Sequence, residues 1–92
     1  MEIIEIRSFK VEIDPDEPVY IMSVVSHLVH IPEWTIRQLD KAGIVCPKRK
    51  ARQKRLYCQN DIKKLEYIHY LMEERGVNIK GIKVILELEK DI

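Results

Sequence analysis

Cysteine and glycine are scarce in this sequence, and each scarcity excludes a class of function. The chain has 92 residues with two cysteines, Cys46 and Cys58, and three glycines. Two cysteines cannot build the disulfide framework on which small secreted domains depend. Three scattered glycines form no phosphate-binding loop, and no nucleophile–base set or pair of catalytic carboxylates is visible. We therefore do not expect an enzyme.

Long hydrophobic runs and a targeting signal are also missing. The longest stretch without charge lies between Glu17 and Glu33, and it contains two prolines, two serines and two histidines. It is too short and polar to span a bilayer. The chain starts Met-Glu-Ile-Ile-Glu, without the basic segment of a signal peptide, so we expect a cytoplasmic protein with no membrane partner. At 46% hydrophobic and 34% charged residues, the length suits one small globular domain.

Charge is abundant but unevenly distributed. The formal net charge is +1, yet residues 1–18 carry a net −4, residues 19–58 a net +6 and residues 59–92 a net −1. A localised positive region inside a nearly neutral chain is typical of a protein that binds a phosphate-rich partner.

The first segment predicts β-structure followed by a linker. Residues 3–13 alternate apolar and charged residues, with a change of parity near Ser8. This pattern predicts a strand with a bulge, or two short strands. Residues 14–18 are acidic and contain two prolines, which predicts a linker. We therefore divide the chain into residues 1–17, a strand segment with its acidic linker, and residues 18–90, the domain proper.

Two short helices follow, joined by a tight turn. Ser23 is a favourable N-cap for a helix that extends to about His30, where Ile31-Pro32 interrupts it. A second helix is expected over residues 32–42, ending at Gly43. Two short helices in this arrangement predict a helix-turn-helix unit.

The second helix has an inner and an outer face. Ile36 and Leu39 are three residues apart and are expected to face the core, whereas Arg37, Gln38 and Lys41 fall mostly outward. Trp34 is open to two interpretations, a core aromatic or an exposed ring that packs on a sugar–phosphate backbone.

A strongly basic ribbon is predicted after the second helix. Residues 44–46 and 56–58 have strand-like composition, and between them six of the eight residues from Lys48 to Arg55 are basic. The basic residues are Lys48, Arg49, Lys50, Arg52, Lys54 and Arg55. Residues 47–57 thus form a predicted wing. A helix over 61–75 ends at Gly76, and Asn78 caps a last helix. The fold class is therefore mostly α with a small β wing, a winged helix-turn-helix preceded by an N-terminal strand segment.

The wing and the second helix together predict binding to double-stranded DNA. Six cations in eight residues repel one another unless a polyanion neutralises them, so a merely solubilising loop is the weaker interpretation. Membrane headgroups are a rival polyanion, but the run has no amphipathic helical pattern or apolar anchor. On a helix in the major groove, Gln38 can pair with adenine and Arg37 with guanine or phosphate.

The remaining chemistry-bearing residues do not predict a cofactor or a metal site. Cys46 and Cys58 bracket the wing, so they form either a redox-sensitive pair or half of a metal site, or, as we favour, they are two small and mostly buried residues. The three histidines show no metal-ligand spacing with one another or with the cysteines.

The chain resembles the MerR family of winged-helix transcription regulators, and the HspR-like heat-shock repressor branch in particular. The matching segments are residues 18–25 (PVYIMSVV), 35–49 (TIRQLDKAGIVCPKR), 55–57 (RLY), 61–62 (DI) and 76–83 (GVNIKGIK). The similarity covers about residues 18–88. It implies DNA contacts from Arg37, Arg49, Arg55 and Tyr57, with Thr35 and Gln38 at or beside the groove. It also implies a homodimer on an inverted repeat, repression of chaperone genes in a stress response, and an Hsp70-type chaperone as a partner.

The chain departs from the family pattern in several places. Leu39 stands where the family often has an aromatic residue, the wing tip at residues 51–53 has no glycine, and Cys58 replaces the usual serine cap. The last predicted helix is short for the family's dimerisation helix. We therefore expect the segment 3–13 to supply self-association, by pairing with another copy or with its own domain.

Two other functions are consistent with the same residues. One is a small architectural or excisionase-like factor that bends DNA. The other is a protein-interaction module, in which the acidic segment binds a partner and the wing only improves solubility.

Overall fold

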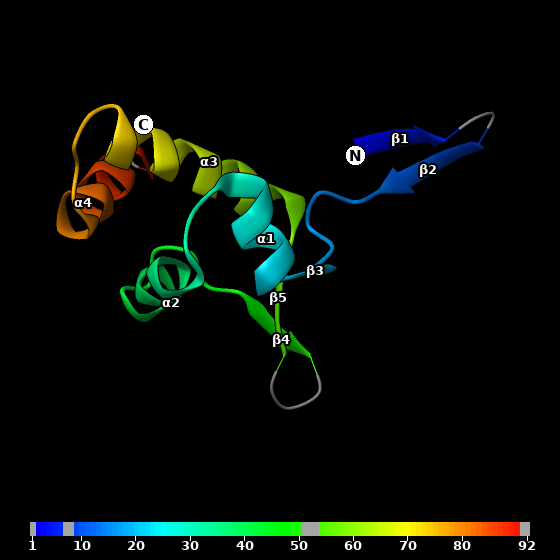
Figure 1. Ribbon diagram of the computed structural model, residues 1–92, viewed down its shortest axis with the longest axis horizontal. Helices are drawn as coiled ribbons and strands as arrows, with labels where there is room; N and C mark the ends of the chain where they lie inside the picture. The colour runs from blue at the N-terminus through cyan, green and yellow to red at the C-terminus, as the bar shows by residue number, and fades with distance from the viewer. Residues whose placement is uncertain (1, 7–8, 51–53, 91–92) are drawn as a thin grey trace.

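The computed structural model describes residues 2–6, 9–50 and 54–90. In chain order the elements are β1 (Glu2–Ile6), β2 (Phe9–Ile13), β3 (Tyr20–Ile21), α1 (Met22–Val29), α2 (Glu33–Lys41), β4 (Lys48–Lys50), β5 (Lys54–Tyr57), α3 (Gln59–Glu73) and α4 (Ile79–Lys90). Figure 1 shows the helices gathered in one body, the β4–β5 wing projecting from it and the β1–β2 hairpin standing apart. The predicted class, mostly α with a small β wing, is confirmed.

The α1–α2 pair forms the predicted helix-turn-helix unit. α1 ends at Val29, and His30 adopts a left-handed conformation with φ 58° that redirects the chain. Across the turn, the Ser26 hydroxyl donates a hydrogen bond of 2.6 Å to the carbonyl of Ile31. Pro32 then serves as the N-cap of α2, a position that requires no backbone N–H.

α1 begins earlier than the sequence predicts. Its N-cap is Ile21, in extended conformation, and no side chain caps the helix. The prediction of Ser23 as the cap was wrong because β3 pairs antiparallel with β5, which keeps the backbone extended as far as Ile21. Ser23 consequently lies inside the first turn of the helix.

The wing is the outer part of a three-stranded antiparallel sheet with the order β3-β5-β4. The predicted strand over 44–46 was wrong, since the structure begins β4 at Lys48. Ile44 N donates to the carbonyl of Leu39 at 2.9 Å, and the carbonyl of Ile44 accepts from Lys64 Nζ at 2.5 Å. Ile44 therefore satisfies its backbone with helix and lysine partners instead of a strand ladder.

The two C-terminal helices start at side-chain caps. Asp61 Oδ2 accepts a hydrogen bond of 3.0 Å from Cys58 N, which fixes the first turn of α3 two residues before the predicted start. Gly76, with φ 64°, redirects the chain after α3. Asn78 Oδ1 accepts from Gly81 N at 2.8 Å, so the predicted cap of α4 is confirmed.

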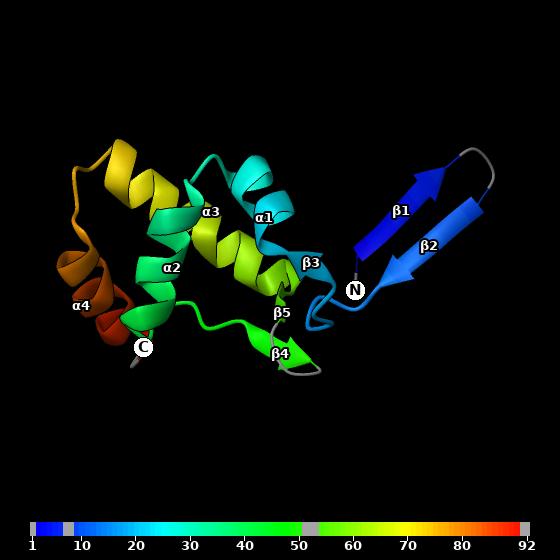
Figure 2. The same ribbon diagram turned by 60° about the horizontal axis from the view of Figure 1, so that its bottom comes forward.

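One hydrophobic core joins the helices to the wing. Its fully buried large side chains come from all of these elements: Val25, Ile36, Leu39, Val45, Tyr57, Leu65, Ile68 and Ile82. Figure 2 shows the helices together on one side of the molecule, with the hairpin extending away on the other. No helix in the described part of the chain is long and apolar enough to cross a membrane.

Candidate nucleic-acid interface

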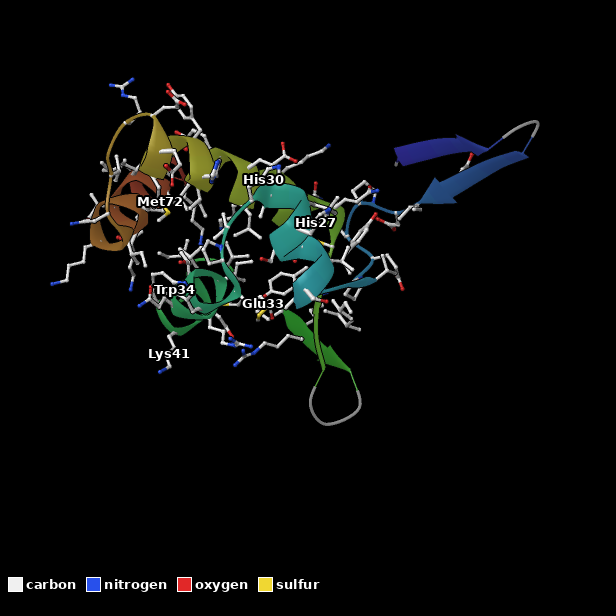
Figure 3. All side chains as sticks on the ribbon, in the orientation of Figure 1. His27, His30, Glu33, Trp34, Lys41 and Met72 are labelled. Atoms are coloured by element: carbon white, nitrogen blue, oxygen red, sulfur yellow. The ribbon has the colours of Figure 1, made fainter. Side chains whose placement is uncertain are left out.

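α2 presents a distinct outer face. Ile36 and Leu39 are fully buried, as predicted, and they anchor the helix to the core. Arg37, Gln38 and Lys41 are exposed, and Figure 3 shows Lys41 extending away from the body. The three exposed residues lie within one helical turn of each other, so α2 offers a continuous polar and basic surface.

Trp34 belongs to this outer face. Its side chain is 62% exposed, which decides between the two interpretations in favour of the exposed ring. The sequence already indicated this position, because Trp34 is three residues before Arg37 and seven before Lys41, a spacing that places the three side chains on one face of a helix. Aromatic rings exposed beside cations are suited to packing on sugar–phosphate or base surfaces.

Two residues of the predicted contact set lie inside the core instead. Thr35 is 4% exposed and Tyr57 is 0% exposed. Thr35 is next to Ile36 on the inner side of α2, and Tyr57 ends β5 where the wing enters the core. A side chain enclosed in this way cannot reach a ligand while the core is intact, so these two residues support the interface without forming its surface.

The wing concentrates basic residues in register. Arg49 pairs with Arg55 across the ladder and Lys50 with Lys54, while Lys48 is exposed opposite Leu56. The ladder therefore gathers basic residues in one short ribbon, a composition that favours an anionic partner. Of the predicted wing residues, Arg52 lies outside the described residues.

An ion pair links the wing to α2. Arg55 Nε lies 3.4 Å from Asp40 Oδ2, and the two side chains are only 30% and 17% exposed. Sequence reasoning assigned Arg55 to DNA and gave Asp40 no role. The pair joins the two surfaces that are predicted to touch DNA and so sets their relative orientation.

A second ion pair holds Arg37 in a different way. Arg37 lies 3.6 Å from the carboxylate of Glu33, one turn earlier on α2, and both side chains are about half exposed. Exposed pairs of this kind contribute little stability, so the guanidinium can exchange Glu33 for a phosphate or a base at small cost.

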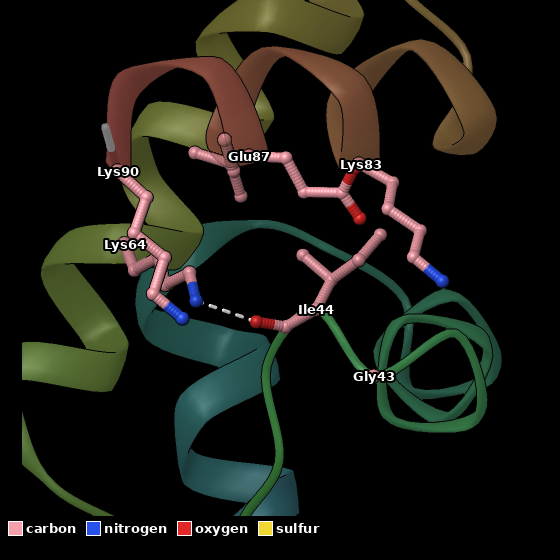
Figure 4. Close-up of a pocket in the computed structure, with 7 residues that line it drawn as sticks. Gly43, Ile44, Lys64, Lys83, Glu87 and Lys90 are labelled. Atoms are coloured by element: carbon pink, nitrogen blue, oxygen red, sulfur yellow. Dashed lines mark hydrogen bonds between the residues drawn. The ribbon is translucent and has the colours of Figure 1, made fainter. Parts of the chain in front are cut away.

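A side chain of α3 holds the loop that follows α2. Gly43 has φ 73°, a left-handed conformation that favours glycine. The Lys64 hydrogen bond to Ile44 holds the next residue, as Figure 4 shows. The cavity beside them is about 130 Å³, below the size of an ordinary small-molecule site, and its α4 wall includes Lys83 and Glu87. The glycine conformation and the lysine hydrogen bond together hold the chain between α2 and the wing.

The two cysteines line one cavity of about 400 Å³ at the base of the wing. Cys46 is exposed, so the interpretation of two mostly buried cysteines was wrong for that residue. Cys58 is partly buried, and burial raises the pKa of its thiol.

Within the described ranges, no three histidine, cysteine or acidic side chains are grouped so as to hold a metal ion.

Comparison with known proteins assigns this arrangement to a family. Residues 20–89 match the model of the MerR HTH family regulatory proteins. A heat shock protein HspR of Streptomyces coelicolor is 40% identical over 81 residues, which is 88% of this chain and 54% of that protein. The HTH-type transcriptional regulators GlnR of Bacillus anthracis and Bacillus cereus are 30% identical over 74 residues, or 80% of this chain and 57% of theirs. This chain thus spans little more than half the length of these relatives. The chain belongs to the MerR family of helix-turn-helix regulatory proteins.

Proposed function

We propose that this protein is a transcriptional regulator that binds specific sequences of double-stranded DNA. The observation that carries the proposal is the joint surface of α2 and the wing, which the Arg55–Asp40 ion pair holds together. α2 would lie in the major groove, and the wing would contact the flanking phosphates.

The residues divide by their chemistry. Gln38 presents an amide that can pair with adenine, and Arg37 a guanidinium that can pair with guanine, so these two would discriminate sequence. Lys41 and Lys48 are exposed cations suited to phosphate contacts. Arg49, Lys50, Arg52 and Lys54 would add further phosphate contacts from the wing.

The relatives guide the biological role that we propose. Similarity to a protein named as a heat shock protein supports a repressor of stress-response genes that acts in the cytoplasm at the nucleoid. The family resemblance supports a homodimer on an inverted repeat and an Hsp70-type chaperone as a partner. We also propose that the chain divides into a DNA-binding domain over 18–90 and a separate segment over 1–17, and the extent of the family match over 20–89 is the support for this division.

Selection of bound fragments from a random duplex library tests this function. We expect enrichment of one sequence, present as two half-sites in inverted orientation, because a two-fold symmetric dimer places its two α2 helices in successive major grooves. Binding at low salt without any enriched sequence would instead favour an architectural factor. Failure to bind duplex at low salt would overturn the proposal and favour a protein-interaction module.

A further inference from the structure

Glu33, on the outer face of α2, is a carboxylate to which the proposed DNA contacts give no role. We propose that Glu33 reads cytosine, with its carboxylate accepting a hydrogen bond from the N4 amino group of a cytosine in the major groove. The observation behind the proposal is the position of Glu33 at the N-terminal end of α2, in one line with Arg37 and Lys41. The inference rests on the proposed function and adds a specificity-determining residue to the same surface.

The position of Glu33 on α2 suits contact with a base. Glu33 is the first residue of α2, and its side chain is 44% exposed. Arg37 follows four residues later and Lys41 eight residues later, so the three side chains lie on one stripe of the helix. A recognition helix in the major groove contacts base edges with its N-terminal residues. Glu33 is thus placed where a base contact is expected, whereas flanking phosphates meet the wing.

A carboxylate at this position is unfavourable next to DNA unless it finds a donor. The exposed neighbours Arg37 and Lys41 are basic, and the phosphates that they attract repel a negative side chain. An acid in the first turn also favours the helix dipole, but that interaction is the same for every bound sequence. Glu33 in the groove therefore requires a hydrogen-bond donor on the DNA itself.

An ion pair accommodates the charge of Glu33 in the free protein. Arg37 Nη2 lies 3.6 Å from Glu33 Oε1, and the Arg37 side chain is 53% exposed. An exposed pair of this kind is weak, so Arg37 can turn to guanine or to phosphate when DNA binds. Glu33 then loses its cation, and the amino group of cytosine replaces it as the hydrogen-bond donor.

The chemistry of the carboxylate selects among the four bases. An ionised carboxylate accepts hydrogen bonds and donates none. In the major groove cytosine presents the N4 amino donor, whereas guanine presents two acceptors, and thymine an acceptor and a methyl group. Adenine presents an amino donor beside the N7 acceptor, which repels the second carboxylate oxygen. Cytosine is therefore the base that Glu33 favours.

The spacing along α2 limits where the cytosine lies. Side chains one helical turn apart are about 5–6 Å from each other. Successive nucleotides of one DNA strand are about 3.4 Å apart along the helix axis. We therefore expect the cytosine within two base pairs of the position that Arg37 contacts.

Selection from a random duplex library by the wild type and by Glu33→Gln tests the proposal. Glutamine keeps the shape of the side chain but both donates and accepts, so it no longer requires a donor. We expect the wild type to enrich cytosine at one position of each half-site, and Glu33→Gln to lower that preference at least about fivefold. Glu66→Gln is the matched control and is expected to keep the preference. Glu66 is exposed on α3 and lines a cavity with Tyr20 and Leu28, outside the proposed contact surface.

Substitution of the base tests the contact without any change to the protein. N4-methylcytosine still pairs with guanine, but a methyl group replaces the amino hydrogen that faces the major groove. The wild type is expected to bind the site with this base at least about fivefold more weakly than the unmodified site. Glu33→Ala is expected to bind the two sites equally.

Arg37→Ala separates direct reading by Glu33 from an effect that acts through Arg37. This variant is expected to keep the cytosine preference, because the carboxylate and its base are both still present. Loss of the preference in Arg37→Ala would show that Glu33 only positions the guanidinium and would overturn the proposal.

The remaining outcomes distinguish this inference from the proposed function. The inference alone is overturned if the wild type enriches a sequence but no cytosine, if Glu33→Gln keeps the preference, if Glu66→Gln loses it, or if the wild type is indifferent to N4-methylcytosine. Duplex binding by the wild type without any enriched sequence would overturn the proposed function, and this inference with it.

Discussion

Arg55 Nε lies 3.4 Å from Asp40 Oδ2, and this ion pair fixes the wing against the last turn of α2. Arg55 is the register partner of Arg49 in the β4–β5 ladder, so the ion pair brings an acidic side chain of α2 to the basic wing. We therefore expect Arg55 to influence DNA binding through the orientation of the wing, in addition to the DNA contact that the family resemblance implies.

A double-mutant cycle of Arg55→Gln and Asp40→Asn measures this link. We expect a coupling of about 0.5–1.5 kcal/mol in the free energy of unfolding, because both side chains are largely shielded from water. The same cycle on Arg37 and Glu33 is the control, where we expect about 0.3–0.5 kcal/mol for an exposed pair one turn apart. Equal couplings in the two cycles would contradict the role assigned to Arg55.

Gln38→Ala is expected to alter sequence preference more than affinity. Loss of the amide removes a bidentate contact to adenine, which is worth about 1–3 kcal/mol of discrimination at one base pair. Competition between the selected site and a site changed at that pair measures the effect. Lys41→Ala, on the same exposed face, is the control and is expected to weaken both sites alike. Unchanged discrimination in Gln38→Ala would show that Gln38 does not contact a base.

The two aromatic residues Trp34 and Tyr57 are expected to respond in opposite ways. Tyr57→Ala removes a fully buried ring and is expected to lower the free energy of unfolding by about 3–5 kcal/mol, measured by urea denaturation. Trp34→Ala removes a ring that is 62% exposed, so it is expected to change stability by less than about 1 kcal/mol while weakening DNA binding. A destabilised Trp34→Ala protein with intact DNA affinity would place Trp34 in the core instead.

The two thiols are expected to react at different rates. Cys46 is exposed, whereas Cys58 is partly buried and burial raises the pKa of its thiol. A raised pKa leaves less thiolate at a given pH, so alkylation of Cys58 is slower and continues to accelerate into more alkaline solution. Iodoacetamide labelling of Cys46→Ser and Cys58→Ser, each with one thiol, measures both rates by mass spectrometry. Faster labelling of the Cys46→Ser protein would contradict the observed burial.

Local patterns in the sequence predicted most of the fold. The spacing of Ile36 and Leu39 predicted the inner face of α2, and Asn78 predicted the start of α4, because helix periodicity and caps act over a few residues. The start of α1 and the absence of a strand at 44–46 depended on partners far along the chain. β5 holds Ile21 extended, and Lys64 takes the carbonyl of Ile44.

The residues of the candidate interface also fall into those that local sequence patterns predicted and those that depend on distant parts of the chain. The exposed positions of Arg37, Gln38 and Lys41 followed from the sequence, since one helix determines them. The burial of Tyr57 and the Arg55–Asp40 ion pair did not, because each depends on how the wing returns to the core. Only three-dimensional packing brings those elements together.

The salt dependence of duplex affinity tests the central claim most directly. If α2 and the wing together make five to eight phosphate contacts, log K against log salt concentration is expected to fall with a slope of about −4.5 to −7. Lys48→Ala, which removes one exposed wing cation, is expected to make that slope shallower by about 0.9. Absence of duplex binding at low salt, or a slope that Lys48→Ala leaves unchanged, would contradict the assignment of this surface to DNA.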